Sequence, residues 1–232
     1  MAATLTQRSS VQRSRRTLVL DLDGTLVDSV PDLAAALNRL MMRRGLAGFA
    51  DAAVAAMVGD GARVLVERGF AARGAAPDGG ALAEFLADYT ANAAHTTRPY
   101  PGVEATLGLL AEKGWRMAVC TNKPIAAARP LLAALGLARF FAAVSGGDSY
   151  AVRKPDPGHL LATLAEAGGE VGRALMVGDH HNDLAAASGA GMPAIFAAWG
   201  YGPRAAGRDA AAIAACFADL PAIVARLLPP SV

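Results

Sequence analysis

Short apolar runs alternate with helical segments along much of the chain. The runs that resemble strands are Thr17–Leu22, Trp115–Cys120, Phe141–Ser145, Ala174–Val177 and Ala194–Ala197, with a sixth candidate near Ala214–Phe217. The helical segments between them include Pro124–Leu135, His159–Ala167 and Asp183–Ala190. Apolar runs of this length, separated by helices, are typical of buried strands that pair in parallel. Because such a sheet is covered by helices on both faces, the pattern predicts an α/β core.

Residues 31–98 interrupt this alternation. Four helical segments follow one another there without a good strand among them: Pro31–Arg44, Asp51–Val58, Ala62–Phe70 and Gly80–Ala94. We expect Ser29 and Asp32 to form a capping box at the start of the first helix, and the proline-containing segment Arg98–Gly102 to form a stiff hinge after the last. The sequence thus predicts a core made of residues 17–30 and 99–232, and an inserted helical cap domain made of residues 31–98.

Composition and charge exclude several classes of protein. Hydrophobic residues make up 53% of the chain and charged residues 18%, as is typical of a folded protein. The formal net charge of +2 provides no basic field for a nucleic-acid partner. No apolar run approaches the roughly 18 residues of a membrane span. Neither a nucleic acid nor a membrane is therefore an expected partner, and the oligomeric state, monomer or homodimer, stays open.

The first residues and the two cysteines bear on the cellular compartment. Residues 1–16 contain four arginines and no acid, so we expect a disordered leader, although such a composition also occurs in mitochondrial transit peptides. Cys120 and Cys216 both lie in apolar surroundings. Buried free thiols in a reducing cytoplasm fit them better than a disulfide framework does.

Polar side chains follow four of the predicted strands. These are Asp21 and Asp23 after the first strand, Thr121 and Asn122 after the second, Lys154 after the third, and Asp179 and Asp183 after the fourth. Any one of them could be an ordinary turn residue. Because ligands of open parallel sheets bind outside the carboxyl ends of the strands, however, the four groups together predict a site at one edge of the sheet.

The lysines and the aspartate pair indicate what this site binds. Of the 22 basic residues only Lys113, Lys123 and Lys154 are lysine, which suits a phosphate or carboxylate at close quarters. Lys113 has the position of a surface residue, and for Lys123 a surface position and a site position are equally compatible with the sequence. The strand period of two places Asp21 and Asp23 on the same side. Two carboxylates this close need a cation, for which Mg²⁺ is the natural candidate.

The motifs that contain these residues are DLDGTLVDS, CTNKP, RKPDP and VGDHHND. In this order, and with a helical insertion after the first, they resemble the four motifs of the haloacid dehalogenase superfamily. The resemblance extends from Thr17 to Leu220 and implies a Rossmann-like parallel sheet with a cap domain. It also implies a Mg²⁺-dependent reaction on a small phosphorylated metabolite.

The resemblance assigns a role to each motif residue. Asp21 would attack phosphorus to form an aspartyl-phosphate, while Asp23 would protonate the leaving alcohol and then activate water. Thr121 would donate a hydrogen bond to the phosphoryl group, and Lys154 would neutralise it. Asp21, the backbone carbonyl of Asp23 and Asp179 would bind Mg²⁺, with Asp183 as a further ligand or as the partner of one. Gly24 would let the backbone approach the phosphate closely, and Asn122 would contribute to substrate binding.

The cap and one loop carry a narrower resemblance. MVGDGARVLVERG (Met57 to Gly69) and WGYG (Trp199 to Gly202) resemble the corresponding segments of phosphoglycolate phosphatases. Gly61 and Arg63 then become candidate substrate-binding residues, with Arg63 able to pair with a carboxylate; the alternative is that Arg63 faces solvent. His180 replaces the small hydroxyl residue usual among relatives. We expect it, like His181, to be a solvated loop histidine.

The residues exclude some other activities within and outside the superfamily and leave others open. Phosphonate cleavage requires a cap lysine, and residues 29–101 contain none; dehalogenases lack the equivalent of Asp23. A sugar-phosphate phosphatase, a pyrophosphatase and a β-phosphoglucomutase-like mutase share the core motifs and remain open. A phosphoryl-receiving regulatory module is disfavoured by the position of Asp21 on the first strand and by Asp23. The expected activity is a phosphatase acting on 2-phosphoglycolate.

Overall fold

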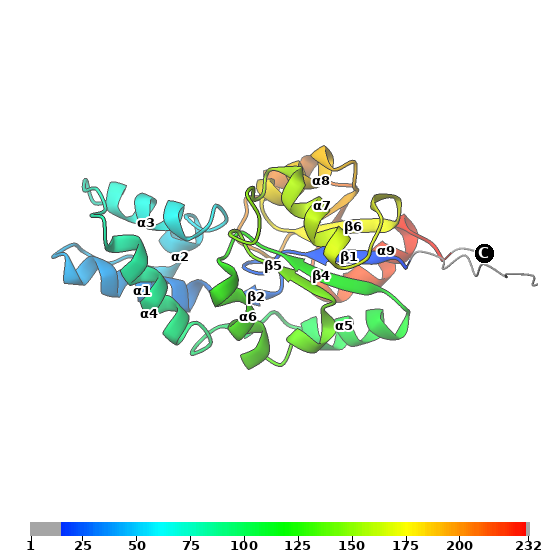
Figure 1. The fold of residues 1–232 in the computed structure, drawn as a ribbon, viewed down its shortest axis with the longest axis horizontal. Helices are drawn as coiled ribbons and strands as arrows, with labels where there is room; N and C mark the ends of the chain where they lie inside the picture. The colour runs from blue at the N-terminus through cyan, green and yellow to red at the C-terminus, as the bar shows by residue number, and fades with distance from the viewer. Residues whose placement is uncertain (1–14, 231–232) are drawn as a thin grey trace, which may run out of the picture.

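A six-stranded parallel sheet forms the centre of the molecule. The computed structural model describes residues 15–230, in which the strand order is β5-β4-β1-β6-β7-β8 (Figure 1). The strands are β1 (Thr17–Leu20), β4 (Arg116–Cys120), β5 (Ala143–Ser145), β6 (Ala174–Gly178), β7 (Ala194–Ala197) and β8 (Ala212–Ala214). The central strand β1 pairs with β4 and β6, so that Leu18 lies opposite both Met117 and Leu175. The predicted α/β class with a Rossmann-like parallel sheet is confirmed.

Helices cover both faces of this sheet because its strands are apolar on both sides. Helices α5 (Val103–Glu112), α6 (Ile125–Ala134) and α9 (Leu220–Leu227) pack on the face that receives Leu18 and Leu20. Helices α7 (Pro157–Glu166) and α8 (His181–Gly189) pack on the face that receives Val19 (Figure 1). Single turns of 3-10 helix lie at Ala138–Phe140, Val171–Arg173 and Phe217–Asp219, and a longer one at Arg204–Asp209. Among residues 15–230 no helix is both long and apolar enough to cross a membrane.

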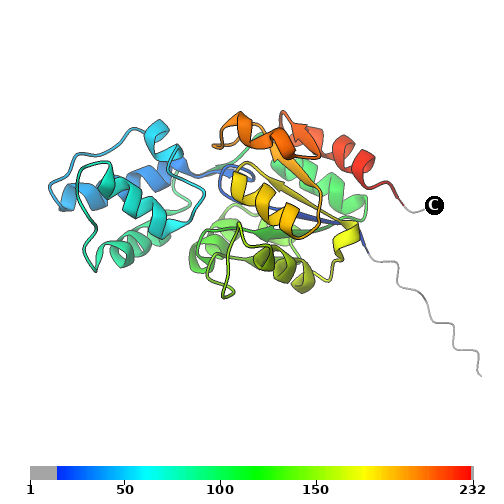
Figure 2. The same ribbon diagram turned by 90° about the horizontal axis from the view of Figure 1, so that it is seen from above.

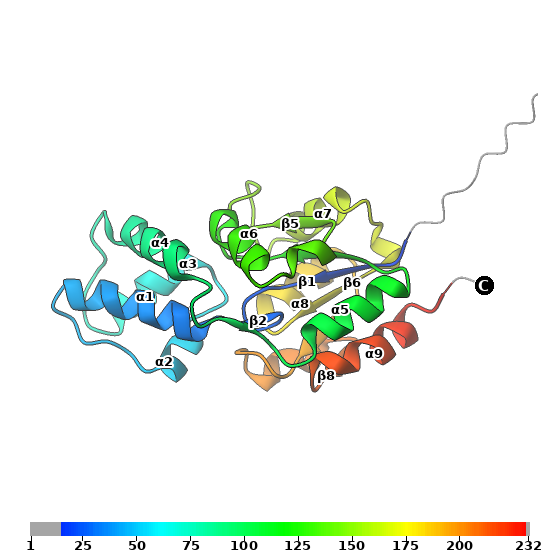
Figure 3. The same ribbon diagram turned by 90° about the horizontal axis from the view of Figure 1, so that it is seen from below.

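A helical cap stands apart at one end of the sheet, as Figures 2 and 3 show from above and below. It consists of α1 (Val30–Arg43), α2 (Asp51–Ala55), α3 (Ala62–Ala71) and α4 (Ala81–Asn92). The cap has its own apolar core, in which Leu37, Met41 and Phe85 are completely buried. Two short antiparallel strands, β2 (Val27–Asp28) and β3 (Arg98–Pro99), connect it to the sheet domain.

The expected capping box at the start of α1 is wrong. Ser29 occupies the N-cap position but makes no capping hydrogen bond, because its hydroxyl donates to Asp23 Oδ1 at 2.6 Å. The Asp32 carboxylate instead accepts the backbone N–H of Thr97 at 2.8 Å and its hydroxyl at 2.7 Å. Asp32 therefore joins the start of the cap to its end, next to the hinge strands.

Three further expectations need correction. The sixth strand spans Ala212–Ala214 and ends where the predicted segment begins, because Phe217 turns into the core as the start of a 3-10 helix. Cys216 is exposed rather than buried. Most of the predicted disordered leader, residues 1–14, lies outside the described residues, but Arg16 is ordered: its guanidinium donates to the carbonyl of Leu228 at 3.1 Å and lies 4.7 Å from the ring centroid of Trp115.

Candidate active site

Three buried carboxylates and one lysine meet where the central strands end. Asp21 follows β1, whereas Asp179 and Asp183 lie between β6 and the first turn of α8. One oxygen from each of these carboxylates lies within 4.8 Å of the others. The Lys154 ammonium is 2.9 Å from Asp21 Oδ1 and 2.6 Å from Asp183 Oδ1. A single lysine leaves two negative charges unbalanced in this cluster.

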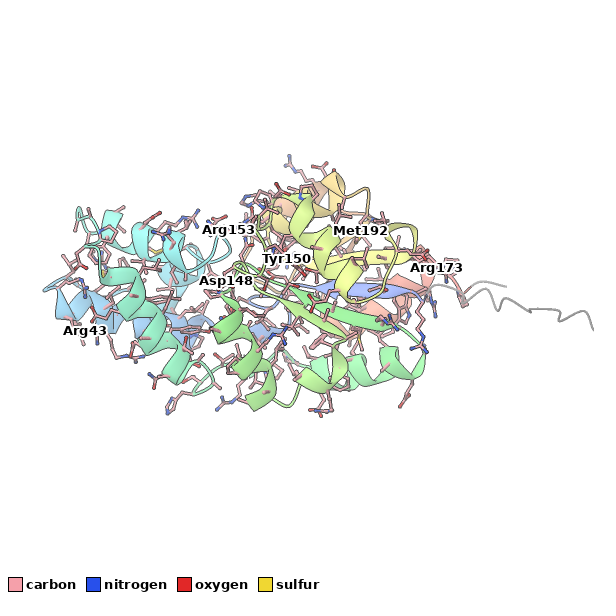
Figure 4. The ribbon with its side chains drawn as sticks, in the orientation of Figure 1. Arg43, Asp148, Tyr150, Arg153, Arg173 and Met192 are labelled. Atoms are coloured by element: carbon pink, nitrogen blue, oxygen red, sulfur yellow. The ribbon has the colours of Figure 1, made fainter. Side chains whose placement is uncertain are left out.

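Lys154 comes from the loop between β5 and α7. The labelled residues Asp148, Tyr150 and Arg153 mark this loop at the end of the core that faces the cap (Figure 4). The Lys154 side chain is 1% exposed, and Nζ also donates to the carbonyl of Cys120 at 2.6 Å. Burial opposes the positive charge, but the carboxylates of Asp183 and Asp21 outweigh it and raise the pKa of Lys154. Lys154 is thus a permanent cation that touches two carboxylates.

The crowding of carboxylates raises their own proton affinity. Burial raises the pKa of Asp21 to about 6, although Lys154 acts in the opposite direction. Burial, together with repulsion from Asp21 and Asp183, raises the pKa of Asp179 to about 7. Carboxylate oxygens are ligands of hard divalent cations, and a charge of +2 would balance the cluster. The residues present therefore fit a divalent metal ion.

Asp179 is held in place by three donors. The Thr25 hydroxyl donates to Oδ1 at 2.9 Å, and the backbone N–H groups of Tyr201 and Gly202 donate to Oδ2 at 2.8 and 3.2 Å. Gly24 has φ +82°, and a Cβ there would lie 2.4 Å from Asp179 Oδ2. The glycine expected to approach a phosphate therefore packs directly against this carboxylate. The sequence indicated no role for Thr25, and it pointed to Tyr201 only as part of the segment WGYG.

Asp23 has a different set of partners from Asp21. Its carboxylate accepts hydrogen bonds from Lys123 Nζ at 2.8 and 3.0 Å, in addition to the bond from Ser29. The Lys123 side chain is 3% exposed, and Nζ lies 4.4 Å from the ring centroid of Tyr89 on α4. Lys123 is therefore a site residue rather than a surface lysine. Asp23 is thus paired with a different lysine from the Lys154 that Asp21 shares with Asp183, so the charge of its side chain is balanced without a shared metal ion.

Thr121 and Asn122 line the same site from the end of β4. Both side chains are buried. The Thr121 hydroxyl oxygen accepts the backbone N–H of Lys123 at 3.2 Å. Asn122 Nδ2 donates to the carbonyl of Lys154 at 2.9 Å and to the carbonyl of Gly59 in the cap at 3.0 Å. Asn122 thus joins two loops of the core to the cap, a role that the sequence did not indicate.

A cavity of about 40 Å³ lies between the cap and the core. The core contributes Asp21, Asp23, Thr121, Asn122, Lys123 and Pro124, and the cap contributes Gly59, Gly61, Ala62, Leu65, Phe85 and Tyr89 among others. The predicted residue Gly61 thus reaches the cavity, where it is the N-cap of α3. Arg63 does not: it is exposed on α3 and lines a different cavity together with Glu67. The helix turns Arg63 away from the face that carries Ala62 and Leu65.

His180 is not a solvated loop residue, contrary to expectation. It is the half-buried N-cap of α8, where its backbone N–H donates to Asp183 Oδ2 at 3.0 Å and its ring accepts the N–H of Asn182 at 3.4 Å. Asp183 thus caps a helix with one oxygen and contacts Lys154 with the other. His181 is exposed, as expected.

Comparison with known proteins agrees with this arrangement. Residues 15–191 match the model of the haloacid dehalogenase-like hydrolases. The phosphoglycolate phosphatase of Agrobacterium fabrum is 46% identical over 187 residues, which are 79% of this chain and 80% of that protein. That of Rhodospirillum rubrum is 46% identical over 194 residues, 80% of each chain. The crystal structure of a predicted phosphoglycolate phosphatase from Haemophilus somnus 129pt superposes with a TM-score of 0.82 at 30% identity, over 90% of this chain and 97% of that one. The chain therefore belongs to the haloacid dehalogenase-like hydrolase family, as its four motifs predict.

Proposed function

We propose that the chain is a Mg²⁺-dependent phosphatase that hydrolyses 2-phosphoglycolate to glycolate and phosphate. The observation that carries this proposal is the Asp21 carboxylate, which is fixed by Lys154, adjoins Asp179 and Asp183, and opens on a small cavity. The relatives named above that are called phosphoglycolate phosphatases support the choice of substrate. The buried free thiol of Cys120 agrees with a reducing cytoplasm.

The reaction divides between two aspartates that line the same cavity. An oxygen of Asp21 attacks phosphorus, the bond from phosphorus to the glycolate oxygen breaks, and Asp23 gives a proton to that oxygen. Asp23 then takes a proton from water as the water oxygen attacks phosphorus, which releases phosphate and restores Asp21. Splitting one difficult displacement into two easier ones is the advantage of a covalent intermediate. Lys123 and Ser29 hold the Asp23 carboxylate in place for both proton transfers.

Charge on the phosphoryl group is balanced by the residues around Asp21. Lys154 supplies a fixed positive charge, and it keeps Asp21 ionised against the effect of burial. The Thr121 hydroxyl accepts a hydrogen bond, so its own proton is free to be donated to a phosphoryl oxygen. Mg²⁺, held by Asp21, Asp179, Asp183 and the backbone carbonyl of Asp23, would supply Lewis-acid stabilisation of the phosphoryl charge.

The lining of the cavity suits an anionic substrate once a divalent cation balances its carboxylates. Among the described residues that line it, Lys123 carries the one positive charge, against the carboxylates of Asp21 and Asp23. On the cap side, Gly61 and Ala62 form the start of α3, whose first turn contains no acidic residue. Because backbone N–H groups at a helix start attract anions, this turn, rather than Arg63, is suited to bind the carboxylate of 2-phosphoglycolate.

A panel of substrates tests the proposal. The value of kcat/KM should be highest for 2-phosphoglycolate when it is compared with pyrophosphate, glucose 1-phosphate and glycerol 3-phosphate, and EDTA should abolish turnover. A preference of about tenfold or more for another compound, about 1.4 kcal/mol in transition-state binding, would overturn the substrate but not the reaction. A protein that is phosphorylated once and releases no phosphate would instead be a regulatory module.

A further inference from the structure

A second group of metal-ligating side chains lies where the cap meets the core. It consists of Asp60, in the cap loop between α2 and α3, and of His180 and His181 at the start of α8. One ligand atom from each residue lies within 4.8 Å of the others. None of the three belongs to the carboxylate cluster around Asp21. Two imidazoles and a carboxylate are donors for zinc and similar transition metals, whereas Mg²⁺ prefers oxygen ligands alone.

The two histidines are arranged so that they can bind one ion. Their ring centroids are 4.1 Å apart, and the ring planes are inclined at 46°. His181 is exposed, which leaves a path for an ion from solvent. The cap loop comes close to His180 because Gly59 has no side chain: a Cβ there would lie 2.7 Å from the imidazole ring. The loop therefore places its next residue, Asp60, beside both rings.

Asp60 is oriented by groups around it. Asn182 Nδ2 donates to Asp60 Oδ1 at 2.7 Å, and Arg68 Nη2 lies 2.5 Å from Oδ2. Burial acts against the ionised form, but these two partners outweigh it and lower the pKa of Asp60, which keeps it a carboxylate. A metal ion would displace Arg68 from Oδ2. Arg68 is partly exposed and also donates to the carbonyl of Met57 at 2.9 Å, so it keeps a partner when it moves.

We propose that Asp60, His180 and His181 form a binding site for a transition-metal divalent cation of the zinc class, and that the bound ion holds the cap against the core. The ligands come from both sides of the boundary, so a full site exists only while the two domains are in contact. Gly59 and Gly61, on either side of Asp60, line the substrate cavity. Under the proposed function, a metal ion at Asp60 thus restrains a loop that lines the substrate cavity, and it slows any passage of substrate or product that needs this loop to move.

Zinc binding to the full-length protein tests the site without any need for turnover. Zn²⁺ affinity is measured by competition with a chromophoric chelator, with millimolar Mg²⁺ present to occupy the carboxylate cluster. Wild type and the control His95→Ala, which removes an exposed histidine of the cap, should each bind one Zn²⁺. His181→Ala and Asp60→Asn should bind it about tenfold or more weakly, because loss even of a group that only orients a ligand typically weakens metal binding about 10- to 100-fold. Equal affinity in all four proteins would overturn the proposal.

Two further measurements separate this site from the proposed active site. Asp21→Asn should bind zinc as wild type does; if it loses zinc while His181→Ala keeps it, zinc competes at the carboxylate cluster and the proposal is wrong. Hydrogen exchange tests the restraint on the cap. Zn²⁺ should slow exchange of the backbone amides of residues 57–61 in wild type and His95→Ala but not in His181→Ala. Unchanged exchange in wild type would refute the restraint. The rate of a phosphatase reaction enters neither test, so the proposed function can fail independently.

Discussion

Replacing Asp21 by asparagine should remove activity and, in the absence of Mg²⁺, increase stability. The pKa of Asp21 is raised from 3.8 to about 6 in the folded protein, mainly by burial. A folded-state pKa above the unfolded value means that stability is lost as the pH rises from about 4 to about 6, and the loss is complete above that range. At about 1.4 kcal/mol per pKa unit, the ionised Asp21 destabilises the fold by about 3 kcal/mol at neutral pH.

Asparagine has nearly the same shape as aspartate but is neutral, so it does not destabilise the fold through a buried charge. Without Mg²⁺ at neutral pH, Asp21→Asn should therefore be more stable than wild type by up to about 3 kcal/mol, and at pH 4 the two should be equally stable. Urea denaturation in EDTA measures the difference. Mg²⁺ should stabilise wild type more than the variant, because an ion that binds only the folded state raises its stability.

Turnover of p-nitrophenyl phosphate with Mg²⁺ completes the test. Asp21→Asn should show no measurable turnover, because an amide cannot act as the nucleophile. Asp209→Asn, which removes an exposed aspartate, is the matched control and should change stability by less than about 0.5 kcal/mol. If Asp21→Asn retains more than a few per cent of wild-type turnover, the covalent mechanism is wrong. A variant less stable than wild type in EDTA would refute the electrostatic reasoning.

Three other predictions concern the surroundings of the cluster. Lys154→Met should lower the free energy of unfolding by about 3–5 kcal/mol in EDTA, because it leaves buried carboxylates without their cation. Urea denaturation measures this change, and a loss below about 1 kcal/mol would contradict the prediction. Burial, aided by Lys154, lowers the pKa of His159 to about 4, so protonation favours the unfolded state as the pH falls from about 6.5 to 4. Between pH 7 and 4.5 the free energy of unfolding of wild type should fall by about 2 kcal/mol more than that of His159→Gln. If the two fall in parallel, His159 does not cause the loss of stability. Gly24→Ala should raise the Mg²⁺ concentration for half-maximal activity about tenfold, because its Cβ would displace the Asp179 carboxylate. Gly45→Ala, also at positive φ but with open space around it, should leave that concentration unchanged.

The sequence by itself determined the core of the fold and the meeting of Asp21, Lys154, Asp179 and Asp183. Alternating apolar runs and helices leave few arrangements other than a covered parallel sheet. Once the strands run parallel, their carboxyl ends share one edge, so residues that directly follow them must come together. Local spacing is sufficient for Asp21 and Asp179, which directly follow a strand, and Lys154 and Asp183 lie on the loop or helix that follows a strand at the same edge.

Only the tertiary structure decided how the cap and the core meet. The hydrogen bond from Asn122 to Gly59 joins residues 63 positions apart, and the pairing of Asn182 with Asp60 joins residues 122 positions apart. The rotation of α3 placed Arg63 outside the cavity, and the approach of Gly59 left His180 half-buried against expectation. These contacts depend on the position of one domain relative to the other. No local pattern encodes that position, because it results from packing across the whole boundary.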